Sequence, residues 1–202
     1  MKDEIKLELA NHMKDLGLHM IAKGLVNATF SEMLNPYNHA ISIVHIAHGT
    51  ELLIKSRIAY EHPLLIFSNI PKSTTSTDTK LGIVDLLNKG QTIMFSELPE
   101  RLWATTGYKV PNIDLYNEFG KIRNQIVHLG IPDIELSEAA LSFGFTIIEK
   151  MVNDWWDDTL FNYTTQYDDD CLQYIFEQTD RLNIELKYEL KEYELVKKEN
   201  IN

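Results

Sequence analysis

The chain has 202 residues, of which 44% are hydrophobic and 24% charged, so it can fold around one sizeable core. Its formal net charge of −11 argues against a protein that coats a long stretch of nucleic-acid backbone, but allows a site that binds one or two phosphates. The single cysteine excludes an internal disulfide, and no apolar run approaches the roughly 20 residues of a membrane span. We therefore expect a soluble, cytoplasmic protein without a membrane partner.

Apolar residues recur at helical spacing over the first 60 positions. They predict a first helix over 5–34, with Gly17 and Gly24 as candidate breaks. A second helix is predicted over 37–60. Pro36 opens it, because a missing N–H is tolerated in a first helical turn, and His62-Pro63 ends it.

The middle of the chain is predicted to hold a loop and short helices. Residues 68–79 are polar and lack periodicity, which indicates a flexible loop. A short helix over 81–88 is stopped by Gly90, and another runs from about Ser96 to residue 104. Nothing in these segments makes a strong case for β structure.

Three further helices are predicted in the last third of the chain. The first begins near residue 112 or 114 and ends at Gly130, and the second covers 138–156 behind a cap at Ser137. The last runs from about 168 to 198, and its apolar residues leave both a coiled coil and a simple amphipathic helix open. We predict an all-α bundle of four or five long helices with a loop and short-helix insertion. It forms a single domain over 1–202, with its core in 1–160 and an additional C-terminal helix over 165–199.

The helix that ends at Gly130 carries the most informative pattern. Its apolar residues fall within an arc of about 80° and predict a core-facing stripe. They are Leu115, Phe119, Ile122, Ile126 and Leu129. Asn124 and His128 lie four positions apart on the opposite side, and Arg123 lies at a flank of the stripe. Gly120 and Val127 share the outer half, where a glycine and an exposed valine suit a surface that a second copy covers. An ordinary solvated helix face is the alternative.

Arg123, Asn124 and, after three further residues, His128 resemble the signature of the HEPN superfamily. In that signature an Arg precedes a His by a short spacing on a late helix, and a polar residue directly follows the Arg. Segment 48–55, with His48, Glu51 and Lys55, is similar to the second helix of many such proteins. The resemblance covers residues 37–156.

The resemblance implies a metal-independent endoribonuclease that acts as a homodimer through the motif helix and needs no cofactor. His128 would exchange protons with the RNA 2′-OH or the leaving 5′-oxygen, since imidazole titrates near neutral pH. Arg123 would bind the phosphate, and Asn124 would hold His128 or donate to the phosphate. The family context implies a toxin or anti-phage defence effector, with an antitoxin or defence protein as a further partner.

The supporting residues leave other interpretations open. His48 and Glu51 would line the same cleft, or Glu51 would pair with Lys55 four residues on. A metal site at His45, His48 and Glu51 lacks a firm third ligand. For the whole chain, the alternatives to a ribonuclease are a non-catalytic helical module that binds RNA, a nucleotide or a protein, and a structural subunit.

Overall fold

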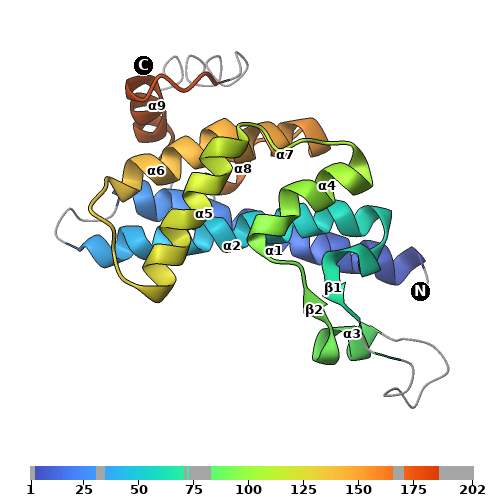
Figure 1. Ribbon diagram of the computed structural model, residues 1–202. Helices are drawn as coiled ribbons and strands as arrows, with labels where there is room; N and C mark the ends of the chain where they lie inside the picture. The colour runs from blue at the N-terminus through green and yellow to red at the C-terminus, as the bar shows by residue number, and fades with distance from the viewer. Residues whose placement is uncertain (1–2, 31–34, 71, 73–82, 166–170, 187–202) are drawn as a thin grey trace. The chain divides into compact units, whose positions relative to one another are not determined.

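The computed structural model describes residues 3–30, 35–70, 72, 83–165 and 171–186 (Figure 1). Helices dominate these residues, which confirms the all-α prediction. The long helices are α1 (Asp3–Phe30) and α2 (Pro36–Glu61). The others are α3 (Ile83–Lys89), α4 (Leu98–Thr106), α5 (Ile113–His128), α6 (Leu136–Phe143), α7 (Glu149–Trp156), α8 (Phe161–Thr164) and α9 (Cys171–Arg181). No helix in the described ranges is long and apolar enough to cross a membrane.

The contacts divide the chain into two compact units. Unit 1 comprises residues 1–18 and 49–110, and unit 2 comprises residues 19–48 and 111–202. Both α1 and α2 contribute one part to each unit, so the two units share their longest helices. The single-domain organisation stays a prediction, and each unit is described separately below.

Unit 1 is built on a close approach of α1 and α2. A Cβ atom at Gly17 would lie 2.8 Å from the backbone oxygen of Gly49, so glycine here permits tight helix packing. Ser56 Oγ donates to the backbone oxygen of Ala10 at 2.7 Å and joins the same two helices. Gly17 therefore does not break α1.

A small antiparallel sheet in unit 1 was not predicted. Strand β1 (Phe67–Asn69) pairs with β2 (Gln91–Thr92), and Phe67 lies opposite Thr92. Two strands of this length give too few alternating positions for a sequence signal. The predicted loop over 68–79 begins inside β1 and otherwise lies mostly outside the described residues.

The core of unit 2 is aromatic. Phe119 of α5 stacks on Phe143 of α6 with ring centroids 3.9 Å apart, and Tyr116 lies against the same ring. All three side chains are fully buried. Gly24 and Gly144 allow close packing here too. A Cβ atom at Gly24 would lie 2.6 Å from a side-chain carbon of Ile46, and a Cβ atom at Gly144 would lie 2.6 Å from a side-chain carbon of Leu25. The predicted break at Gly24 is also wrong.

The helix predicted over 138–156 is confirmed, and it contains a wide turn. It begins at Leu136, and residues Gly144–Ile148 between α6 and α7 are π-helical. Ser137 does not cap it, because the helix starts one residue earlier and Ser137 Oγ donates to the backbone oxygen of Ala28 at 2.8 Å. Single π turns within α-helices are frequent at functional sites.

The last predicted helix is shorter than expected. It ends at Arg181, and residues 182–186 are not helical, so the prediction of one continuous helix from about 168 to 198 is wrong. Asn183 adopts a left-handed conformation (φ 53°), and Ile184 N donates to Thr179 O at 2.9 Å, a helix stop in which Asn replaces the usual Gly. Residues 187–202, which hold the rest of the predicted C-terminal helix, lie outside the described part.

Candidate functional site

The motif residues occupy the last turns of α5, and local interactions fix both ends of this helix. At its start, Asn112 accepts a hydrogen bond from Leu115 N at 3.2 Å, as expected for an N-cap. At its end, the N–H groups of Leu129 and Gly130 donate to Gln125 O at 2.8 and 2.9 Å. Gly130 has φ 139°, which favours glycine and ends the helix after His128.

Burial along α5 corrects the predicted core stripe. Tyr116 and Phe119 are fully buried, whereas Ile122 and Ile126 are only half-buried. Leu129 is 86% exposed, so its assignment to the core is wrong. The helix ends just before Leu129, and helical periodicity therefore no longer determines where its side chain points.

Arg123 and Asn124 interact directly. Arg123 Nη1 donates to Asn124 Oδ1 at 2.8 Å, so the amide oxygen orients the guanidinium. Asn124 is exposed and Arg123 is half-buried, and His128 is exposed in the last turn of the helix. The structure thus brings Arg123 and Asn124 together and places His128 one turn further along α5, where solvent reaches it.

Exposed apolar residues lie within the motif and directly after it. Val127 is 50% exposed, and Leu129, Ile131 and Ile134 are 86, 38 and 48% exposed. We call these four residues the apolar segment. Exposed apolar residues that cluster in this way mark interaction sites more often than single ones do.

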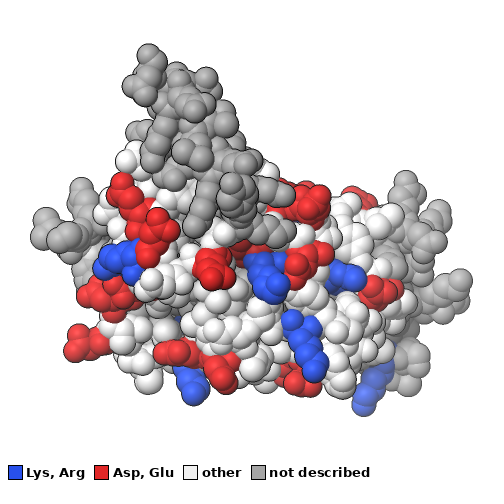
Figure 2. Space-filling model, turned by 90° about the horizontal axis from the view of Figure 1, so that it is seen from above, with Lys and Arg blue, Asp and Glu red and all other residues white. Residues whose placement is uncertain are grey.

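The described residues on the face shown in Figure 2 do not form a broad basic surface. On the face in Figure 2, the Lys and Arg side chains of the described residues alternate with Asp and Glu side chains. Asp114, Glu118 and Lys121 are exposed on α5 itself. A phosphate ligand would therefore depend on a few local cations, and Arg123 is the cation within the motif.

Glu51 and Lys55 form a largely buried ion pair on α2. Lys55 Nζ lies 2.5 Å from Glu51 Oε1 and donates to Thr92 Oγ1 of β2 at 2.9 Å. The predicted pairing of Glu51 with Lys55 is thereby confirmed. These residues belong to unit 1, whereas His48, which is exposed, and the motif residues belong to unit 2.

Glu149 is a buried acidic residue that the sequence pattern did not single out. It is 6% exposed, and its two carboxylate oxygens accept hydrogen bonds from Thr159 Oγ1 and Leu160 N, each at 2.8 Å. A glutamate with apolar neighbours, Ile147 and Ile148 before it and Met151 and Val152 shortly after it, was the available signal. Within the described ranges, no three His, Cys, Asp or Glu side chains gather in a way that would hold a metal ion.

Comparison with known proteins gave no match to this chain, whether with family models, with curated proteins or with solved structures.

Proposed function

We propose that the chain is a metal-independent endoribonuclease of the HEPN type that acts as a homodimer. The observation that carries this proposal is the arrangement at the end of α5. Arg123 and Asn124 are hydrogen-bonded, His128 is exposed one turn away, and the residues of the exposed apolar segment lie on both sides of His128 in the sequence. A solvated structural helix would not need the exposed apolar segment beside these polar groups.

The residue types suit phosphoryl transfer without a metal. In the proposed reaction, His128 of one copy removes the proton from a 2′-OH, and the 2′-oxygen attacks the adjacent phosphorus. The bond from phosphorus to the 5′-oxygen then breaks, and His128 of the second copy protonates that leaving oxygen. The products are a 2′,3′-cyclic phosphate and a free 5′-OH.

Arg123 would bind the non-bridging oxygens of the reacting phosphate. A guanidinium presents paired N–H donors that match two phosphate oxygens, and it stabilises the charge that builds there. Because Asn124 Oδ1 accepts from Nη1 of Arg123, the amide limits the directions in which the guanidinium can point. We therefore assign Asn124 a positioning role toward Arg123.

The homodimer would form through the outer side of α5 and the apolar segment. Covering Val127 and Leu129 removes apolar surface from water, at about 25 cal/mol for each Å². A two-fold contact places the same face of both copies together, so both His128 side chains would enter one cleft. A cytoplasmic toxin or defence effector, paired with an antitoxin or defence protein, is the biological setting that the resemblance adds to this proposal.

Replacing His128 with Ala tests the catalytic part. We expect RNA cleavage to fall by at least about 100-fold, because an essential proton carrier is lost. His12→Ala, which removes another exposed histidine, is the matched control and should cleave as the wild type does. The readout is cleavage of a labelled RNA without divalent cations, with the cyclic phosphate identified by mass spectrometry. Equal cleavage by the wild type and His128→Ala would disprove the assignment, and RNA binding without cleavage by the wild type would favour a non-catalytic module.

Replacing Leu129 with Glu tests the dimer. The charge should weaken self-association at the apolar segment, and cleavage should fall in parallel with the dimer fraction. Sedimentation velocity over a concentration series measures that fraction. Leu7→Glu, at a half-exposed leucine on α1, should leave both unchanged. A dimer that persists in Leu129→Glu would place the interface elsewhere.

A further inference from the structure

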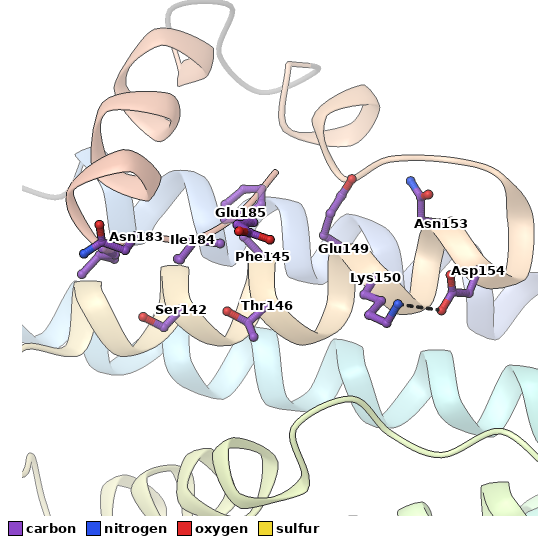
Figure 3. A pocket seen from close by; sticks show the side chains of 11 residues that line it. Ser142, Phe145, Thr146, Glu149, Lys150, Asn153, Asp154, Asn183, Ile184 and Glu185 are labelled. Carbon is purple, nitrogen blue, oxygen red and sulfur yellow. Dashed lines mark ion pairs between the residues drawn. The ribbon is translucent and has the colours of Figure 1, made fainter. Parts of the chain in front are cut away.

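Glu149, Lys150 and Asp154 line a cleft beside the π turn of unit 2, and each already has a partner within the protein (Figure 3). Both carboxylate oxygens of Glu149 accept hydrogen bonds, and Lys150 Nζ lies 3.6 Å from Asp154 Oδ2. These groups therefore do not indicate a ligand. The turn at the end of α5 is different, because its conformation favours glycine and it directly follows the proposed catalytic histidine.

The turn after His128 is held by one carbonyl group. The N–H groups of Leu129 and Gly130 both donate to Gln125 O, at 2.8 and 2.9 Å. The last carbonyl groups of a helix have no partner within the helix, so the order of a terminal turn depends on bonds of this kind. His128 is the last residue of α5. The direction of its side chain therefore depends on whether this turn stays closed.

Gly130 is needed for its backbone conformation and not for packing. Its φ of 139° lies in a region that residues with a Cβ atom rarely adopt. Among the residues that the structure describes, no atom lies within 4 Å of a Cβ atom placed at Gly130. A larger residue would thus meet no obstacle in its surroundings, and its cost would be backbone strain.

This strain would be relieved locally. Leu129 is 86% exposed and Gly130 is exposed as well, so opening the turn uncovers little buried surface. Opening breaks the two hydrogen bonds to Gln125 O and leaves the aromatic core of unit 2 in place. The last turn of α5 should therefore fray before the protein unfolds. His128 belongs to that turn, whereas Arg123 lies five residues earlier in the helix.

We propose that Gly130 is a positioning residue for His128. Its backbone closes the last turn of α5, and the closed turn holds the imidazole in the direction that proton transfer requires. This inference rests on the proposed ribonuclease function, to which it adds the residue that fixes the proton carrier.

Gly130→Ala in the full chain tests the proposal through RNA cleavage. We expect kcat to fall about 10- to 100-fold, because a small misplacement of a reacting group has an effect of this size. KM should change by less than about twofold, since Arg123, which would bind the phosphate, stays in the closed part of the helix. Circular dichroism checks that the variant is folded under the assay conditions, and sedimentation velocity gives the dimer concentration to which kcat is referred.

Hydrogen exchange measures the turn itself, without RNA. In Gly130→Ala, exchange of the Leu129 amide should accelerate at least about tenfold, because its bond to Gln125 O opens more often. Exchange of the Phe119 amide, in the middle of α5, should stay as in the wild type. A general loss of stability would accelerate both.

Gly107→Ala is the matched control. Gly107 also has a positive φ, of 76°, and its N–H ends α4 by donating to Trp103 O at 2.8 Å. A Cβ atom at Gly107 would likewise meet no described atom within 4 Å. This variant should accelerate exchange at the end of α4 and leave kcat unchanged.

The proposal is overturned if Gly130→Ala leaves the exchange of Leu129 unchanged, if it cleaves RNA with the kcat of the wild type, or if Gly107→Ala lowers kcat as much. Each of these results leaves the ribonuclease proposal in place, because the wild type still cleaves. A wild type that cleaves no RNA would refute both proposals.

Discussion

Two polar clusters of this protein differ in their surroundings. In unit 1, the side chains of Lys55 and Glu51 are 6 and 16% exposed, and Lys55 also donates to Thr92 of β2. In unit 2, Arg123 donates to Asn124, an exposed neighbour, and His128 is exposed as well. The sequence pattern put both clusters forward as candidate site residues, but only the second is open to a ligand.

The contrast distinguishes structural from chemical roles for polar residues. A buried ion pair loses its hydration on folding, and each partner then depends on the other for compensation. An exposed pair keeps much of its hydration and contributes little to stability, so it can exchange water for a phosphate. We therefore expect substitutions in the first cluster to lower stability, and substitutions in the second to lower activity.

Lys55→Ala should have the largest effect on stability. It leaves Glu51 buried without the ammonium group, which we expect to lower the free energy of unfolding by about 3–5 kcal/mol. Arg57→Ala is the matched control, since Arg57 forms an i, i+4 pair with Glu61 on the same helix at 2.9 Å but at greater exposure. Its effect should stay below about 1 kcal/mol. Urea unfolding followed by circular dichroism measures both.

The double variant Glu51→Leu/Lys55→Met sharpens this result. If the loss in Lys55→Ala arises because the Glu51 carboxylate has lost the ammonium group, removing both charges should restore most of the stability. Thr92 is exposed, so its hydroxyl can bond to water instead. A double variant as unstable as Lys55→Ala would show that the lost volume and packing of Lys55 dominate.

Arg123→Lys should have the next largest effect, on cleavage. The charge remains, but the paired donors of the guanidinium are lost, so we expect cleavage to fall by about 10- to 100-fold. Its free energy of unfolding should change by less than about 0.5 kcal/mol, as for most surface substitutions. Lys121→Arg, the reverse exchange on the same helix, should leave both unchanged. A large loss of stability in Arg123→Lys would assign Arg123 a structural role.

Local patterns predicted the helices well because helix periodicity, caps and breakers are local signals. Pro36, Asn112 and Gly130 all lie at the boundaries expected from their chemistry. The end of α9 was missed because Asn183 adopts the left-handed conformation without the glycine that normally indicates it. The residue that ends α9 is therefore also a local signal, but an Asn indicates a helix end less clearly than a Gly does.

The environments of charged residues were harder to predict, because their partners come from distant segments. The position of Lys55 follows from contact with Thr92, 37 residues further on, and that of Glu149 from Thr159 and Leu160 beyond the end of α7. Periodicity assigns a residue to a face of a helix, but it does not show what covers that face. In the same way, the exposure of a side chain in one copy does not show what it would contact in a dimer. The dimer contacts of Arg123, Asn124 and His128 therefore stay a prediction.

Tyr60→Phe tests a polar group of intermediate burial and should lower stability less than Lys55→Ala does. The Tyr60 hydroxyl donates to Asn11 Oδ1, so its loss should lower the free energy of unfolding by about 1 kcal/mol, between the values for Arg123→Lys and Lys55→Ala. Burial raises the pKa of Tyr60 above its usual value, Asp15 adds to the rise, and Arg57 opposes it. The folded state therefore holds this proton more tightly than the unfolded state, and the resulting stability is complete below pH of about 10 and lost as the pH rises through the folded pKa. Urea unfolding at pH 8 and near pH 11 should show a smaller difference between wild type and Tyr60→Phe at the higher pH. A difference that grows with pH would mean that the folded protein binds the ionised hydroxyl better than the neutral one. Burial would then fail to predict how strongly each polar group contributes to the free energy of unfolding.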